Sequence, residues 1–158
     1  LLSGYMPPSG ANNRTIIAVY ADAATTADGS NSRLMFAYGK DYGNAFGFIS
    51  VHSTNLKMYT QSNTLVGGTT ATPTTATIAE VGVNGTSVYL YMNGTLDTSS
   101  TQTVNTLGYN SLWIGAGWWS GAGQFTGGIA EIMAFDKALS ASERNDVTTY
   151  LKSKYNIP

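Results

Sequence analysis

Apolar and polar residues alternate over short stretches along most of this chain. Runs of about four to eight alternating or continuously apolar residues are typical of β-strands, and clusters of Gly, Asn, Ser and Pro between them mark turns. We expect about eight or nine such strands, at residues 15–20, 34–38, 45–51, 56–60, 78–83, 88–92, 95–97, 112–115 and 129–135. Because only one helical pattern is present, this succession favours an all-β, two-sheet antiparallel sandwich of the jelly-roll kind over a parallel sheet.

Two Asn-Gly pairs, at residues 84–85 and 93–94, give the strongest turn signals in the chain. Asn-Gly favours the tight turns whose backbone twist suits two paired strands, so each pair predicts a β-hairpin. Another hairpin is expected between residues 34–38 and 45–51. The Thr-rich connector 67–77 contains a proline, which cannot donate a hydrogen bond to a neighbouring strand, and we expect a sheet edge or a loop there.

The last element is predicted to be a helix. Ser140 and Glu143 stand three residues apart, the spacing of a capping box in which each side chain bonds the other residue's backbone N–H. Apolar residues follow at helical spacing, at Val147, Tyr150, Leu151 and Tyr155. We expect this helix to lay one apolar stripe on the sandwich and to serve as a structural latch.

Composition narrows the class of protein. Only 11% of the 158 residues are charged, against about 25% in an average soluble protein. The net charge of −1 and the scattered Lys and Arg residues argue against a nucleic-acid partner. No apolar run reaches the length of a membrane helix, so we expect no membrane insertion. The absence of Cys removes disulfides and thiolate metal sites.

The C-terminal part of the chain carries a specific pattern. A strand with an acidic residue is followed by a short segment that ends in Ala-Leu. A Ser-x-x-Glu-Arg capping segment comes next, and then a helix whose last residues are Tyr-Leu-x-x-Lys-Tyr. These segments are Gly128-Ile129-Ala130-Glu131-Ile132, Phe135-Asp136-Lys137-Ala138-Leu139, Ser140-Ala141-Ser142-Glu143-Arg144 and Tyr150-Leu151-Lys152-Ser153-Lys154-Tyr155. This ending resembles that of laminin-G-like jelly-roll domains of the concanavalin A-like lectin/glucanase superfamily.

A length of 158 residues is in the usual range for one domain. We therefore expect a single laminin-G-like domain over residues 1–158, as part of a larger secreted, cell-surface or virion protein. The resemblance adds the architecture. It implies the fold more firmly than the function, because lectins, glycanases, adhesion modules and virion domains share this architecture. Function therefore has to be argued from candidate sites.

Catalysis is not expected. The glycanases of this superfamily carry acidic residues two apart on one strand, so that two carboxylates flank the glycosidic bond. Here Glu131 has no other acid before Asp136, and Glu80 is alone on its strand. His52 is the sole histidine and cannot form a metal or catalytic cluster alone. We instead expect Glu131 to bond backbone groups or Arg144 and to fix the helix on the sheet.

Calcium is the metal that the resemblance suggests. The loop carboxylates that could bind it are Asp22, Asp28 and Asp41. No Asp-x-Asp-x-Asp-Gly loop gathers them, so we expect solvated loop residues and no cofactor.

The candidate ligand-binding residues are Trp118 and Trp119 on a Gly-rich loop, with Tyr109 and Asn110 shortly before it. Adjacent strand residues point to opposite faces, so two neighbouring Trp side chains cannot both enter one core. One of them then offers a flat apolar face to a sugar ring or a protein neighbour. In the alternative interpretation, both indoles plug one end of the sandwich.

The leading functional hypothesis is a non-enzymatic recognition or adhesion module that binds carbohydrate through these four residues. The alternative is a structural or decoration domain of a virus or phage particle, which acts through neighbouring protein subunits and forms an oligomer.

Overall fold

The computed structural model describes residues 7–23, 32–40, 44–51, 55–59, 65–70, 74–107, 112–115 and 123–158. Within these ranges the chain forms eleven strands and one helix. Their bounds are β1 Arg14–Asp22, β2 Ser32–Lys40, β3 Asn44–Val51, β4 Asn55–Tyr59, β5 Leu65–Gly67, β6 Thr77–Asn84, β7 Ser87–Met92, β8 Thr95–Thr101, β9 Leu112–Ile114, β10 Gly123–Gln124, β11 Gly127–Phe135 and α1 Ala141–Tyr155.

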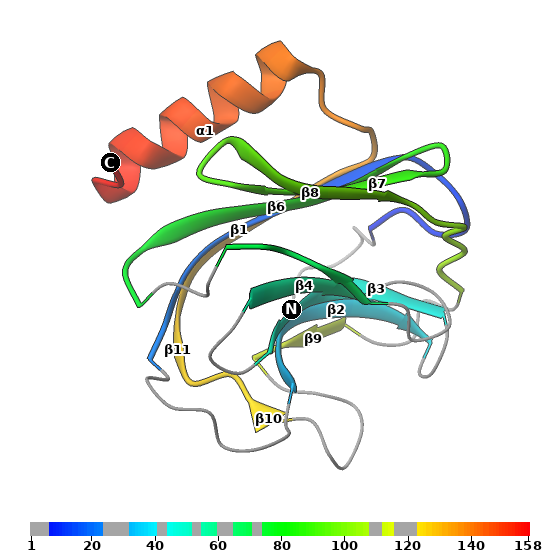
Figure 1. Ribbon diagram of the computed structural model, residues 1–158, viewed down its shortest axis with the longest axis horizontal. Coiled ribbons are helices and arrows are strands. Elements are labelled where there is room, and N and C mark those ends of the chain that lie inside the picture. Colours follow the sequence, from blue (N-terminus) through cyan, green and yellow to red (C-terminus); the bar gives the residue numbers. More distant parts are fainter. Residues whose placement is uncertain are drawn as a thin grey trace.

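The strands form two stacked sheets (Figure 1). The first has five strands in the order β11-β1-β6-β7-β8, and all of its neighbouring pairs are antiparallel. The second has six, in the order β10-β2-β3-β4-β5 with β9 also paired to β2. Its pairs are antiparallel apart from the short parallel contact of β10 with β2. The predicted all-β sandwich is confirmed, with β5 and β10 as strands that the pattern did not predict.

All three predicted hairpins are present. The β6–β7 and β7–β8 pairs turn at the two Asn-Gly sequences, and β2 pairs with β3. Asn93 and Gly94 both have positive φ angles, of 51° and 86°, as a tight turn of this kind requires. The Thr-rich connector begins at the edge strand β5, as expected, while its proline lies outside the described residues.

The five-stranded sheet is apolar on both faces at its centre. On β1, Ile16 and Ala18 point into the core between the two sheets, while Ile17 and Val19 point to the opposite face. All four are at most 1% exposed. Burying both faces of one strand requires a cover on each side, because a half-exposed strand would alternate apolar with polar residues.

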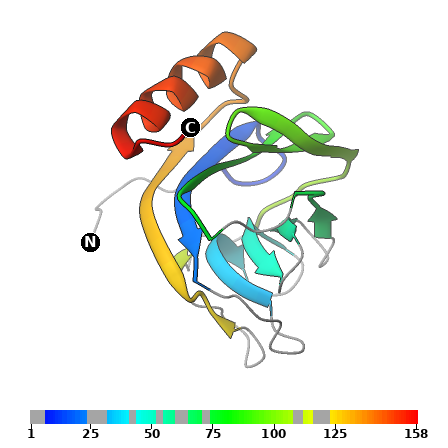
Figure 2. The same cartoon turned by 60° about the vertical axis from the view of Figure 1, so that its left-hand side comes forward.

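The second cover is α1, which lies across the outer face of the five-stranded sheet (Figure 2). Leu151 is completely buried there, among Ile17, Val19 and Ile78 of the sheet. The predicted capping box at Ser140 is present, and the helix ends at Asn156 in the left-handed conformation. Within the described residues, no helix is both long and apolar enough to cross a membrane.

The helix face that contacts the sheet differs in part from the predicted stripe. Tyr150 was expected in that stripe, but half of its surface is exposed, and Thr148 is buried instead. The β7–β8 turn approaches the helix at Thr148. A Cβ atom added to Gly94 would lie 3.0 Å from Thr148 Cγ2. The hairpin therefore covers Thr148, while Tyr150 stays on the open side of the helix.

Asp97 on β8 joins the two sheets at one edge. It accepts hydrogen bonds from the backbone N–H groups of Thr69 and Thr70, at 2.8 and 2.9 Å, and from both of their hydroxyls. Thr69 and Thr70 follow the edge strand of the other sheet. Although partial burial acts in the opposite direction, these hydrogen bonds lower the pKa of Asp97.

Arg14 at the start of β1 ties together segments that are distant in sequence. Its side chain is fully buried and lies over the ring of Phe46, with 5.3 Å from Cζ to the ring centroid. All five of its N–H groups donate to neutral oxygens, namely the carbonyls of Ser9, Gly10 and Asn12 and the hydroxyls of Tyr38 and Thr106. A buried charge without these partners would be strongly unfavourable.

Replacing Arg14 with Met should lower the free energy of unfolding by at least about 3 kcal/mol, because five buried or partly buried oxygens lose a hydrogen bond from its guanidinium. Urea unfolding followed by tryptophan fluorescence measures the change. Lys57→Met removes the same charge from a partly exposed position on β4 and serves as the control. Equal losses in the two variants would contradict the structural role of Arg14.

Candidate functional site: a groove between the helix and the β7–β8 hairpin

The four residues predicted to bind ligand, Tyr109, Asn110, Trp118 and Trp119, lie outside the described residues. Their role therefore stays a prediction. The structure does place the strand between them. β9 pairs antiparallel with β2. Along the chain, Tyr109 and Asn110 come just before β9, and both Trp residues come just after it.

The Trp-containing segment has a defined base. The N–H of Phe125 donates to the carbonyl of Gly115 at 3.0 Å, which brings the two ends of this segment together. On β9 itself, Leu112 and Ile114 are 45% and 55% exposed, while Trp113 packs on the opposite face of the sheet. An exposed apolar strand therefore lies between the two predicted ligand-binding segments.

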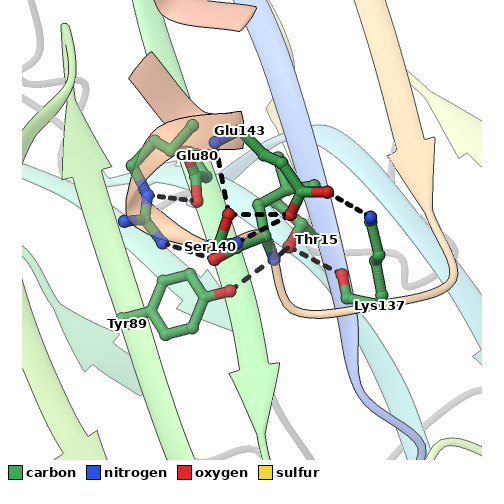
Figure 3. Close-up of polar contacts among 8 residues, drawn as sticks. Thr15, Glu80, Tyr89, Lys137, Ser140 and Glu143 are labelled. Carbon is green, nitrogen blue, oxygen red and sulfur yellow. Dashed lines mark hydrogen bonds and ion pairs between the residues drawn. The ribbon is translucent and has the colours of Figure 1, made fainter. Parts of the chain in front are cut away.

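The described residues also form a site that the sequence did not reveal, and it begins at the start of α1. Ser140 N–H donates to Glu143 Oε2 at 2.9 Å, and Glu143 N–H donates to Ser140 Oγ at 3.3 Å (Figure 3). Lys137 also donates to the Glu143 carboxylate. Hydrogen bonds from Lys137 and Ser140 lower the pKa of Glu143 to about 2, so this cap stays charged in mildly acidic solution.

Thr15 on β1 anchors the connection that leads into this helix. Its hydroxyl donates to the carbonyl of Lys137 at 2.9 Å and accepts from the N–H of Leu139 at 3.1 Å. The Tyr89 hydroxyl of β7 lies 3.2 Å away (Figure 3). Because one side chain satisfies two backbone groups of the connection, the entry of the helix is fixed relative to β1 and β7.

An ion pair beneath the helix fixes its rotation. Arg144 Nε donates to Glu80 Oε1 at 2.9 Å, and the two side chains are 12% and 3% exposed. The Arg144 guanidinium also lies over the ring of Tyr91, with 4.0 Å from Cζ to the ring centroid, and Nη2 donates to the Leu139 carbonyl. Burial raises the pKa of Glu80, and the hydrogen bond and charge of Arg144 offset only part of that effect.

Beside this pair, a groove separates one face of α1 from the β7–β8 hairpin. Its volume is about 510 Å³. The side chains that line it include an aromatic ring, hydroxyls, amides and two cations, from Tyr91, Thr95, Thr148, Thr149, Asn93, Asn145, Arg144 and Lys152. No carboxylate is among the described residues that line it. The groove can therefore offer hydrogen bonds of both kinds and a positive charge to a polar ligand.

Glu131 fixes the other side of the helix, through partners that differ from the expected ones. The prediction named Arg144 or backbone groups, but Glu131 Oε2 accepts from Lys154 Nζ at 3.0 Å and from the Tyr155 hydroxyl at 2.9 Å. Arg144 instead bonds Glu80, because the sheet order places β6 beneath the first turns of α1. The expected fastening of helix to sheet by Glu131 is present, with a different partner.

The metal and catalytic candidates are only partly described. The expectation that Asp22 is a solvated loop residue is wrong, because it is the last residue of β1 and is buried. Asp28, Asp41 and His52 lie outside the described residues. Among the residues that the structure describes, no three acidic or His side chains gather closely enough to hold a metal ion.

Two packed sheets with one closing helix define a concanavalin A-like jelly roll. The chain belongs to the concanavalin A-like lectin/glucanases superfamily, whose laminin-G-type model matches residues 5–143. The resemblance seen in the C-terminal segment is thereby confirmed over most of the chain. No curated protein matches the chain in sequence.

Solved structures share this fold. The CBM40 of the Ruminococcus gnavus IT-sialidase, bound to α2,3-sialyllactose, aligns with a TM-score of 0.70 and 16% identity, over 88% of this chain and 84% of that one. Domain 4 of an extracellular arabinanase from Geobacillus stearothermophilus, in complex with arabinotriose, aligns with a TM-score of 0.65 and 21% identity, over 89% and 68%. A heptameric pentraxin from Limulus polyphemus gives 0.66 and 12%, over 90% and 72%.

The burial of Glu80 predicts a specific pH dependence. Because its pKa in the folded protein is raised, the stability that Glu80 contributes is complete below the ordinary pKa of 4.5 and is lost as the pH rises through the folded value. Gln cannot titrate, so Glu80→Gln should gain stability relative to the wild type as the pH rises from 4.5. Loss of the ion pair can also change the stability of the variant by a constant amount. Because Arg144 stays protonated, that amount does not alter how the stability difference between variant and wild type changes with pH.

Urea unfolding of both proteins at a series of pH values measures the slope. Glu131→Gln provides an opposite control, because the hydrogen bond from Lys154 lowers the pKa of Glu131. That variant should lose stability relative to the wild type as the pH rises. If the stability difference between Glu80→Gln and the wild type is independent of pH, or falls as the pH rises, burial does not raise the pKa of Glu80. Arg144 would then have the larger effect on that pKa.

Proposed function

We propose that this chain is a non-enzymatic recognition module that binds carbohydrate. The observation that supports this function best is the groove beside α1, which hydroxyl, amide and guanidinium groups line together with the aromatic residue Tyr91. Sugars present many hydroxyls, which both donate and accept hydrogen bonds, beside weakly apolar C–H faces. Asn145, Thr149 and Thr95 are exposed on opposite walls of the groove and can meet such groups from two sides.

The comparisons support the same class of ligand. Two structures with this fold are described with bound oligosaccharides, sialyllactose in one and arabinotriose in the other. A shared fold does not fix the position of a site, so the groove is argued from its own residues. We further propose that the chain is a single domain of a larger protein that acts outside the cell, on its surface or on a virion.

The loop with Trp118 and Trp119, together with Tyr109 and Asn110, is the second proposed contact surface for glycan. Indole rings stack on the flat faces of sugars. The base of this loop lies on β2 of the six-stranded sheet, whereas the groove lies on the outer side of the five-stranded sheet. The base of the loop and the groove thus lie on different sheets, and variants of the two can be tested independently.

A glycan array followed by calorimetry on its best ligand tests the function. We expect the double variant Asn145→Ala, Thr149→Ala to bind at least about tenfold more weakly, since two hydrogen-bonding groups are removed. Trp118→Ala and Trp119→Ala test the loop. A loss of affinity similar to that of the double variant would indicate that the glycan stacks on an indole ring. Absence of binding to any glycan would contradict the proposed function.

Assembly with protein neighbours is the second candidate function, and one surface favours it. An apolar hollow of about 630 Å³ lies between the edge strand β11 and the outer side of α1. Met133, Phe135, Val147 and the half-exposed Tyr150 line it. Exposed apolar surface beside an edge strand is a common feature of interfaces between subunits.

Size-exclusion chromatography with light scattering tests this candidate. Assembly predicts a concentration-dependent oligomer that Tyr150→Asp converts to monomer, because the new charge would be buried without a partner. Thr149→Asp, at the next helix position and outside the hollow, is the charge-matched control. A wild-type protein that stays monomeric at high concentration would exclude self-assembly through this surface.

A further inference from the structure

We propose that the groove beside α1 selects sugars that carry a carboxylate, and that Lys152 is the residue that binds this carboxylate. The inference rests on the proposed function and adds the class of ligand and the residue that recognises it. It follows from the distribution of charge, from the donors left available and from the rigidity of the groove.

The charges of the groove are unbalanced in one place. Arg144 and Lys152 line it, but Arg144 is already neutralised from beneath by Glu80. The Lys152 ammonium has no ion-pair or hydrogen-bond partner among the described residues. The groove therefore has one uncompensated positive charge, at its Lys152 end.

The acidic side chains of the helix face away from the groove. Glu143 is bonded by Lys137 and by the helix cap, and Asp146 lines the apolar hollow on the opposite side of α1. Glu131 is occupied by Lys154 and Tyr155 at the far edge of the sheet. Within the described chain, no carboxylate is thus in position to compete with an anionic ligand for Lys152.

Arg144 contributes fixed hydrogen-bond donors. Its Nε and one N–H of Nη2 are used by Glu80 and Leu139, and stacking on Tyr91 holds the guanidinium plane. The N–H groups of Nη1 are not used by these two contacts. Because the side chain is already immobilised by the fold, a ligand oxygen that accepts from Nη1 pays little rotamer entropy for this contact.

The two cations also set the size of the ligand. Arg144 and Lys152 are eight residues apart on one helix, which separates them by about 12 Å along its axis. This is the length of a disaccharide, and Asn145 and Thr149 lie between them on the same wall. A carboxylate at Lys152 would therefore place a neighbouring sugar ring beside the amide and hydroxyl groups.

Matched pairs of ligands test the charge preference. Oligogalacturonate is compared with its neutral methyl ester, and 3′-sialyllactose with lactose, by calorimetry at low ionic strength. We expect at least one acidic member to bind about tenfold more tightly than its neutral partner, the effect of one charge-assisted hydrogen bond. The two pairs distinguish a uronic acid from a sialic acid as the source of the carboxylate.

Two matched variants test the residue. Lys152→Gln should reduce the acid preference to about none, whereas Lys154→Gln removes the same charge two residues along, at a side chain that bonds Glu131, and should retain it. The backbone carbonyl of Lys152 closes the helix, and the Gln substitution leaves that bond intact. Amide shifts of Asn145 and Thr149 on titration with the acidic ligand locate the contact by NMR.

The outcomes separate the two proposals. Equal affinity for the acidic and neutral members of both pairs, or equal effects of Lys152→Gln and Lys154→Gln, would overturn the carboxylate assignment while glycan binding stands. Failure to bind any of the four ligands, while another glycan of an array is bound, would likewise overturn the carboxylate assignment alone. Failure to bind any glycan of the array would overturn both proposals. If Lys152→Gln loses the preference for the acidic ligand and Lys154→Gln retains it, the assignment of the carboxylate to Lys152 is established.

Discussion

The organisation of this domain depends on the need to bury both faces of the same two strands. β1 and β6 are buried along almost their whole length, on the side of the second sheet and on the outer side alike. One sheet can cover only one face. The helix is therefore required for the fold, and its position is set by the apolar residues Ile17, Val19 and Ile78 that would otherwise meet water.

Covering the outer face also creates a difficulty, because Glu80 points from β6 toward the helix. A buried carboxylate needs a partner, and among the residues that the structure describes Arg144, one turn into α1, is the cation that meets it. That pairing fixes the rotation of the helix and turns the next residues along the same face, Asn145 and Thr149, toward the β7–β8 hairpin. The groove thus follows from the way in which a single buried charge is satisfied.

Local patterns in the sequence predicted most of the fold. Tight Asn-Gly turns and a capping box depend on residues a few positions apart, so the hairpins and the start of α1 could be predicted with their positions. β5 and β10 were not predicted, because a strand of two or three residues is too short to show a periodic pattern of apolar residues. The Glu80–Arg144 pair escaped for a different reason. It joins residues that are 64 positions apart, and only the order of strands in the sheet places one beneath the other. The groove depends on that pair and was missed with it.

The two cations of the groove differ in how firmly neighbouring residues hold their side chains. Arg144 is held by Glu80, Tyr91 and Leu139, so changing it would disturb the packing of the helix. Among the described residues, the interaction that Lys152 makes with the fold is through its backbone carbonyl at the helix end, so its side chain can change at little cost in stability. A module built in this way can retain the fixed donor and vary the charged residue, which would let one architecture recognise neutral or acidic sugars by substitution at a single surface position.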